Sequence, residues 1–127
     1  MGLILDSTAL IAAERTGRNA RQALTEIALQ VGGEEIAVSV VTLVELAHGA
    51  ARANTPGRKA KRAQFPRELI TALPAHPVTV SIALRAGQID GENNARGVRL
   101  ALSDLLIGVT ALELGCKIAT ANQQHFQ

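Results

Sequence analysis

The sequence has no tryptophan and no tyrosine, and its only aromatic residues are two phenylalanines. RNA-binding surfaces of the RRM and OB types stack bases on aromatic rings, so the composition argues against both. The core has to be built from aliphatic side chains instead, and 47% of the 127 residues are hydrophobic. Only 19% are charged, which excludes a largely disordered chain. We therefore expect a single domain covering residues 1–127.

Cysteine is nearly absent as well. Cys116 stands alone, so no internal disulfide can form, and the composition fits a reducing compartment. The N-terminus has no basic leader and its apolar run ends at Asp6, so a signal peptide is not expected. No apolar stretch is long enough to span a membrane. These absences predict a cytoplasmic protein with no membrane partner.

The excess of positive charge is small but unevenly placed. The formal net charge is +2, which does not by itself indicate a nucleic-acid partner. One stretch, however, gathers basic residues with no acid among them. This basic cluster consists of Arg52, Arg58, Lys59, Lys61, Arg62 and Arg67. It is predicted to contact RNA phosphates or a protein partner, and a solvated helix face is the simpler alternative.

Short apolar segments alternate with helical patterns along the chain. The expected strands are 2–5, 36–38, 78–80 and 117–121. The expected helices are 7–14, 20–31, 39–53, 58–73, 81–96 and 103–114. This alternation predicts βαβ units, that is, an α/β fold with a short-stranded, mainly parallel sheet covered by helices on both faces. Ligands of such sheets bind at the carboxyl ends of the strands.

The helix ends carry their own signals. Ser7 or Thr8 is expected to cap the first helix, and Ser103 the last. Gly32 follows the second helix and is expected to end it. Gly115 has the position of a glycine C-cap after the last helix. Pro66 is expected to kink or split the helix at 58–73, because proline lacks the backbone N–H that a helix interior uses.

Three carboxylates stand isolated in apolar stretches: Asp6, Glu45 and Asp104. No Lys or Arg lies within a helical turn of any of them. Burying a lone carboxylate is costly unless its charge is compensated. If the three meet in space, the natural compensator is Mg²⁺ or Mn²⁺, which prefer oxygen ligands. Such an ion activates water and neutralises phosphoryl charge, so the pattern favours a metal-dependent hydrolase.

Each of the three carboxylates also has a purely structural interpretation. Asp6 and Asp104 can serve at helix N-termini, where a negative charge is favourable. Glu45 can point outward from the middle of its helix. Spacing alone does not decide between these readings or identify the reaction.

Four segments of the chain form a recognisable series. Asp6 lies in the first, residues 3–12, and Glu45 in the second, residues 39–46. Asp104 lies in the third, residues 103–111, and the fourth, residues 119–126, reads Ala-Thr-Ala-Asn-Gln-Gln-His-Phe. In this order the segments resemble the PIN-domain family, specifically the VapC-type toxins of bacterial toxin–antitoxin pairs. The resemblance implies a three-layer α/β/α PIN-like domain.

The resemblance also implies an activity and a set of site residues. It implies an endoribonuclease that cuts single-stranded or loop RNA, such as tRNA or other structured RNA, with Mg²⁺ or Mn²⁺. By position, Asp6, Glu45 and Asp104 form the catalytic and metal-binding acids, with Asp6 and Asp104 as direct ligands and Glu45 either ligating or orienting water. Supporting polar groups are Ser7, Thr120 and Asn122. The implied partners are RNA, a second copy of the chain, and a cognate antitoxin meeting the basic cluster.

The closing segment departs from the family pattern. Many members carry a fourth acid there, whereas this chain has Asn122 and His125 and no acid beyond Glu113. We therefore expect one firmly bound ion rather than two. Relatives usually continue into one more short strand, which leaves open whether the recorded sequence lacks a C-terminal tail.

The same sequence allows three rival interpretations. A small phosphohydrolase of the kind with paired aspartates needs a second Asp at position 8, where this chain has Thr8. A phosphoacceptor receiver domain needs paired acids after the first strand, which are missing here. A degenerate PIN domain that binds RNA or protein without catalysis remains open because the fourth acid is missing.

Overall fold

The structure, a computed structural model, describes residues 2–120 of the chain. Within them, four short strands form one parallel sheet in the order β3-β2-β1-β4. The strands are β1 Leu3–Leu5, β2 Ile36–Ser39, β3 Ala75–His76 and β4 Lys117–Ala119. The helices are α1 Ser7–Arg15, α2 Ala20–Val31, α3 Val40–Ala51, α4 Pro56–Ala72, α5 Val80–Ala95 and α6 Leu102–Leu114. This arrangement confirms the predicted α/β/α fold with a parallel sheet.

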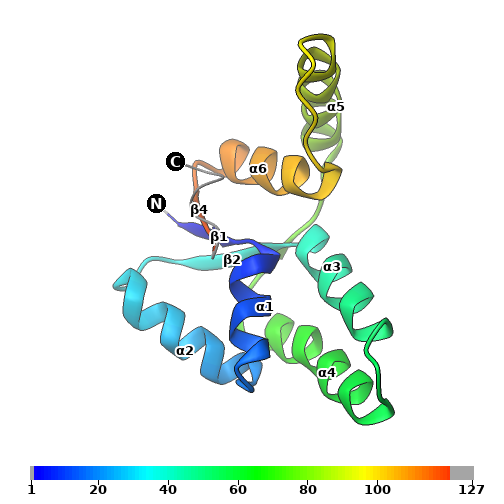
Figure 1. Cartoon of the computed structure of the whole chain (residues 1–127). Coiled ribbons are helices and arrows are strands. Elements are labelled where there is room, and N and C mark those ends of the chain that lie inside the picture. The colour runs from blue at the N-terminus through cyan, green and yellow to red at the C-terminus, as the bar shows by residue number, and fades with distance from the viewer. Residues whose placement is uncertain (1, 121–127) are drawn as a thin grey trace.

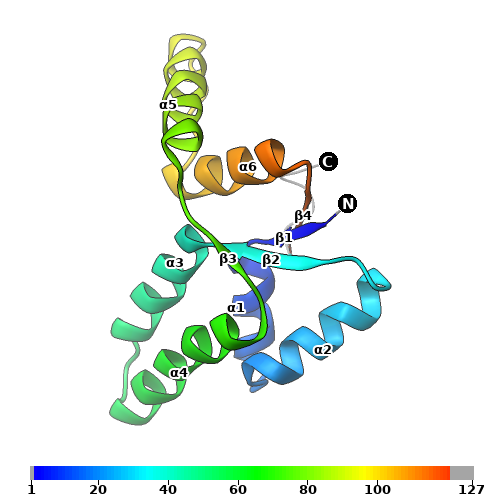
Figure 2. The ribbon, with the colours of Figure 1, turned by 180° about the vertical axis from the view of Figure 1, so that it is seen from behind.

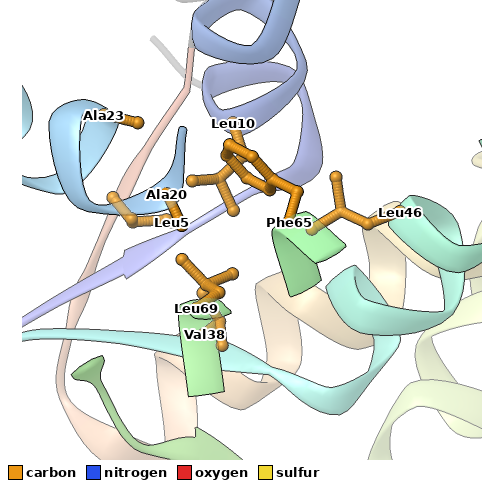
Figure 3. Close-up of a cluster of buried hydrophobic side chains, with 8 residues drawn as sticks. All are labelled: Leu5, Leu10, Ala20, Ala23, Val38, Leu46, Phe65 and Leu69. Carbon is orange, nitrogen blue, oxygen red and sulfur yellow. The ribbon is translucent and has the colours of Figure 1, made fainter. Parts of the chain in front are cut away.

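The central strand β1 supplies side chains to both faces of the sheet. Successive residues of a strand point to opposite sides, and Ile4 and Leu5 are both fully buried. Leu5 packs in the cluster that contains Phe65 and Leu69, which Figure 3 shows in close-up. Ile4 packs with Ile107 of α6 on the other side. Figure 1 accordingly shows α1 to α4 on one face of the sheet and α6 on the opposite face.

Helix α5 projects away from the sheet in Figures 1 and 2. It packs on α6 through Ile82 and Ala86, which contact Leu105 and Val109. Its outer side is largely exposed, and Leu84 keeps 71% of its surface in solvent. The α5–α6 pair is thus a small helical unit with a core of its own, attached to the sheet through α6. No helix of the described residues is long and apolar enough to cross a membrane.

Several helix ends agree with the sequence signals, but the cap of α1 differs. Gly32 and Gly115 end α2 and α6 in the left-handed conformation, each with φ 67°. Helix α1, however, is capped by Asp6 and not by Ser7 or Thr8, because the Asp6 side chain accepts the backbone N–H of Ala9. Asp6 therefore has a structural role in addition to any chemical one.

Two further predictions were wrong. The predicted strand at 78–80 is absent: Val78 packs into the α5–α6 core, Thr79 caps α5, and Val80 is already helical. The edge strand lies slightly earlier, in the segment between Pro74 and Pro77 that was expected to be a connection. Ser103 does not cap α6, since the first helical bond runs from Leu105 to the carbonyl of Ala101, placing Ser103 inside the first turn.

Helix α4 is continuous through its internal proline. It extends over Pro56–Ala72, with Pro66 in its interior and Pro56 in its first turn. The expected split at Pro66 is therefore not observed. On the side facing the sheet, Phe65 and Leu69 bury themselves in the core on either side of Pro66. Their burial offsets the backbone hydrogen bond that a proline removes.

Candidate metal site at the carboxyl end of the central strand

Asp6 lies directly after β1, where the chain leaves the sheet. The residue is 4% exposed, and its backbone N–H donates to the carbonyl of Ala119 at 3.0 Å. Its Oδ1 accepts the Thr8 hydroxyl at 2.7 Å and the Ala9 N–H at 3.1 Å. Among the described residues, none donates a hydrogen bond to Oδ2. One carboxylate oxygen is thus held by the protein and the other is available to a ligand.

The end of β4 reaches the same place. The Thr120 hydroxyl lies 2.8 Å from the Thr8 hydroxyl, which in turn contacts Asp6. Thr120 was predicted as a supporting polar group, and its hydroxyl is connected to the Asp6 carboxylate by two hydrogen bonds that run through Thr8. Ser7 is buried at the start of α1. Asn122, the third predicted supporting group, lies outside the described residues.

Glu45 lies on α3, the helix that directly follows β2, and β2 is the neighbour of β1 in the sheet. Ser39 ends β2 and caps α3, so this helix begins at the same edge of the sheet as α1. One turn before Glu45, the Thr42 hydroxyl donates to the carbonyl of Leu5 at 3.5 Å, and Leu5 directly precedes Asp6. The Oε1 atom of Glu45 is buried and has no hydrogen-bond partner in the described part of the molecule. A buried oxygen without a donor calls for a water molecule or an ion.

Asp104 has a different environment from the other two acids. It lies in the first turn of α6 and is exposed. It lines a hollow on the α5–α6 unit together with Arg99, Leu100 and Leu112. The N-cap Ala101 offers no side-chain acceptor, so the carboxylate of Asp104 also complements the positive end of the helix. Asp104 is therefore exposed, whereas Asp6 is buried and Glu45 is partly buried.

The oxygen atoms around Asp6 and Glu45 match the ligand preferences of a divalent cation only in part. Within residues 2–120, no group of three or more His, Cys, Asp or Glu side chains is gathered closely enough to hold a metal ion. Mg²⁺, however, commonly uses one or two protein carboxylates and completes its octahedron with waters and substrate phosphate. Asp6 and Glu45 each offer an oxygen without a hydrogen bond in the described region. These carboxylate oxygens are the type of ligand that Mg²⁺ and Mn²⁺ prefer.

The basic cluster is not uniform. Arg62 forms an ion pair with Glu14 at 3.6 Å, which ties α4 to α1. Burial raises the pKa of the Glu14 carboxyl above its ordinary value, and Arg62 offsets part of this effect. The rest of the cluster is exposed: Arg52, Arg58, Lys59, Lys61 and Arg67. Of these, Arg52 lies in the turn between α3 and α4 and the other four lie on α4. Figures 1 and 2 both show this turn at the end of the molecule away from the sheet.

A groove runs between α3 and α4 beside the basic cluster. Its lining is mostly apolar, with Leu43 and Ala47 from α3 and Pro66 and Ile70 from α4. Lys59 and Arg67 also line it. A groove of this kind matches an apolar helix that carries acidic residues.

Sequence reasoning missed the role of Thr8. Thr8 was considered as a helix cap and as the place where a second acid is missing, whereas its hydroxyl joins Asp6 to Thr120. The two threonines are 112 positions apart. Only the parallel pairing of β1 with β4 brings them together. The nearest signal in the sequence is that a polar residue two positions after a strand-end Asp lies within reach of its carboxylate.

Comparison with known proteins agrees with this fold. A structure of VapBC2 from Rickettsia felis, bound to a DNA fragment from its promoter, is similar with a TM-score of 0.77 and 18% identity over 99% of this chain and 91% of that one. DNA-bound VapBC from Salmonella typhimurium is similar with a TM-score of 0.77 and 22% identity over 99% and 90%. A toxin–antitoxin complex from Klebsiella pneumoniae gives 0.68 and 25% over 98% and 90%.

The sequence itself supplies the family. A search among curated proteins gave no match. The family model of the PIN domain, in contrast, matches residues 3–127, nearly the whole chain. The match includes the three acidic segments and the closing segment singled out above. The chain belongs to the PIN-domain family.

Proposed function

We propose that this chain is a Mg²⁺- or Mn²⁺-dependent endoribonuclease and the toxin of a toxin–antitoxin pair. It would hydrolyse phosphodiester bonds in single-stranded or loop RNA, including loops of tRNA. One observation carries the chemical part of the proposal. At the carboxyl end of β1, buried Asp6 has one carboxylate oxygen that receives no hydrogen bond from the described residues. Helix α3, which bonds to the neighbouring Leu5, carries Glu45, whose buried Oε1 also has no hydrogen-bond partner there. Family membership and the similarity to VapBC structures support the biological part.

The protein groups have distinct tasks in this proposal. A bound Mg²⁺ or Mn²⁺ supplies an activated water and neutralises phosphoryl charge. Asp6 would hold the ion through Oδ2, because its Oδ1 is fixed by Thr8 and Ala9. Glu45 would ligate or orient water through Oε1, which lacks a protein donor in the described region. Asp104 would complete the ligand set from α6, where its exposure leaves it open to solvent and RNA.

The antitoxin is proposed to dock on the α3–α4 groove. Its apolar lining and its two basic residues, Lys59 and Arg67, suit an amphipathic helix with acidic side chains. The other exposed cations, Arg52, Arg58 and Lys61, extend the positive surface around the α3–α4 turn. Because this turn lies away from the sheet in Figures 1 and 2, we favour the antitoxin over RNA as the partner of the basic cluster.

A homodimer is also part of the proposal. The α5–α6 unit and its connection carry most of the largely exposed big apolar side chains of the described chain. These are Val80, Leu84, Val98, Leu100, Leu102, Leu112 and Leu114. Exposed apolar patches of this kind are typical of interfaces. Contact between two copies through α5 would remove part of this surface from water.

A second candidate function is a degenerate PIN domain that binds RNA or protein without cleaving. Two observations favour it. The described residues contain no ready cluster of three metal-ligating side chains, and no acid follows Glu113 in the sequence. Under this reading, Asp6 and Asp104 serve only their helix N-termini.

Cleavage of RNA decides between the two functions. Protein stripped of metal would be incubated with a pool of tRNA and other structured RNA, with Mg²⁺ or Mn²⁺ added back. Asp6→Ala, Glu45→Gln and Asp104→Ala variants would be tested alongside. We expect discrete fragments that form only when metal is present. The rate of cleavage should be lower by at least about 100-fold in each variant, as for removal of groups that act in the transition state.

The controls separate loss of chemistry from loss of folding. Each variant would be checked by circular dichroism and by RNA binding in the absence of metal. An Arg96→Ala variant, which removes an exposed cation bonded only to Asn93 in the described structure, should cleave normally. Metal-independent cleavage, or full activity in Asp6→Ala, would refute the proposal. RNA binding without any cleavage by folded protein would favour the degenerate domain.

A further inference from the structure

Three oxygen atoms from three elements form a continuous chain next to the proposed metal ligand. The Thr8 hydroxyl at the start of α1 lies 2.7 Å from Asp6 Oδ1. The Thr120 hydroxyl, just after β4, lies 2.8 Å from the Thr8 hydroxyl. Both distances are those of good O–H···O hydrogen bonds. The end of β4 is thereby connected to the carboxylate that ends β1.

The direction of the protons in this chain follows from chemistry. An ionised carboxylate can only accept, so the single hydroxyl proton of Thr8 has to go to Asp6. The Thr8 oxygen then has no proton left for Thr120. In the contact between the two hydroxyls, Thr120 is therefore the donor and Thr8 the acceptor. A hydroxyl that accepts a hydrogen bond donates more strongly, so Thr120 reinforces the bond from Thr8 to Asp6.

The bond from Thr8 is not needed to cap α1. The Ala9 N–H already donates to the same Oδ1 and completes the cap. Thr8 adds a second donor, from the side chain, on that one oxygen. With two donors on Oδ1, rotation of the carboxylate is restricted, and Oδ2 keeps a fixed direction.

We infer that Thr8 and Thr120 act as positioning residues, a directed hydroxyl relay that fixes Asp6 so that its Oδ2 is presented to a divalent cation. This inference rests on the proposed function, because it assigns Asp6 to the metal. Groups that orient metal ligands typically account for about 10- to 100-fold in metal affinity or activity. Of the two threonines, Thr8 is the essential member, since its hydroxyl is the one that donates to the carboxylate. Thr120 acts through Thr8 and should matter less.

The test compares four variants of the full chain. Thr8→Val removes the hydroxyl at nearly constant shape, and Thr8→Ser restores it. Thr120→Val removes the outer donor. Thr25→Val is the matched control, since the Thr25 hydroxyl bonds only to Arg21 within α2 in the described structure. Binding of Mn²⁺ to metal-free protein would be measured by electron paramagnetic resonance, together with kcat and KM for RNA and with urea unfolding.

We expect Thr8→Val to weaken Mn²⁺ binding and to lower kcat by about 10- to 100-fold, with KM for RNA unchanged. Thr8→Ser should recover most of both. Thr120→Val should weaken both by less than about 10-fold, because Thr8 still donates to Asp6. Thr25→Val should match the wild type.

Failure of the inference can be told apart from failure of the proposed function. If wild-type protein binds Mn²⁺ and cleaves RNA while Thr8→Val does both equally well, the relay is refuted and the nuclease stands. The same conclusion follows if Thr120→Val is more harmful than Thr8→Val, or if Thr8→Ser fails to recover. If wild-type protein neither binds Mn²⁺ nor cleaves, the proposed function fails and the relay loses its purpose with it.

Discussion

The two faces of the sheet are covered very differently. On one face, α1 to α4 enclose a core in which Leu5, Leu10 and Leu69 have no exposed surface. On the other, α6 packs on the sheet, and α5 rests on α6 with its outer side exposed. The proposed acids are divided in the same way. Asp6 is buried beside the first core, whereas Asp104 lies exposed on the second unit. The face covered by α1 to α4 therefore holds the larger buried core, whereas the α5–α6 unit on the other face exposes more apolar surface.

The largest expected difference between the faces is in stability. Leu69→Ala removes a fully buried side chain and should lower the free energy of unfolding by about 2–5 kcal/mol. Leu84→Ala makes the same change on the outer side of α5, where 71% of the side chain is exposed, and should cost less than about 0.5 kcal/mol. Both positions are helical, so helix propensity cancels. Urea unfolding at low protein concentration measures both.

A large loss of stability in Leu84→Ala would contradict the expectation that the outer side of α5 contributes little to the folded state. A cost that grows with protein concentration would show that the outer side of α5 is buried between two copies, as the proposed homodimer requires. A large cost independent of concentration would mean that α5 packs more tightly on the molecule than Figures 1 and 2 show.

A smaller difference is expected between the two aspartates at helix N-termini. Asp6→Ala removes the cap of α1 and should destabilise the protein by about 1 kcal/mol. Asp104→Ala removes an exposed first-turn carboxylate and should change stability by at most about 0.5 kcal/mol. Thermal unfolding of metal-free protein gives both values. Asp6→Asn is the control, because Asn also caps helices but carries no charge. If Asp6→Ala were more stable than the wild type, repulsion near Asp6 would outweigh its capping bond.

The smallest effect concerns pH. Burial raises the pKa of Glu14 above its ordinary value of 4.5, and Arg62, Arg15 and Lys61 lower it in part. The folded state therefore holds this proton to a higher pH than the unfolded state, so stability falls as pH rises from about 4.5 through the raised pKa. Glu14→Gln should remove this fall. Stability curves between pH 4 and 7 measure it.

The ion pair on the other face provides the control for this experiment. Glu113 lies 3.9 Å from Arg85 and joins α6 to α5 as Glu14 joins α1 to α4. Glu113→Gln removes one carboxylate from that ion pair and serves as the matched charge control for Glu14→Gln. A wild-type curve that overlays the Glu14→Gln curve would show that Glu14 titrates normally.

Local signals predicted the fold well where tertiary contacts agreed with them. The alternation of short apolar runs with helices predicted the parallel sheet, and Gly32 and Gly115 end their helices where expected. The segment 78–80 failed because Val-Thr-Val has high strand propensity. There the cap supplied by Thr79 and the packing of Val78 on α6 decide the conformation instead.

The candidate site was predictable only in part. Asp6 was expected at the end of the first strand because a buried apolar run stops there, and this position is confirmed. The link from Asp6 through Thr8 to Thr120 could not be predicted, because it depends on the register between β1 and β4. The exposure of Asp104 depends on how α5 and α6 pack, which no local pattern encodes. The roles of the three acids remain predictions.

The pairing of β1 with β4 also sets the order of events during protein synthesis. Leu3 pairs with Lys117, so the ribosome makes the two partners more than a hundred residues apart. At roughly 5–20 residues per second, the first strand waits on the order of ten seconds for its second neighbour. Until then, Asp6 has no contact with Ala119 or with the Thr120 branch of the relay. A nascent chain therefore carries its first acid long before it can assemble the candidate site.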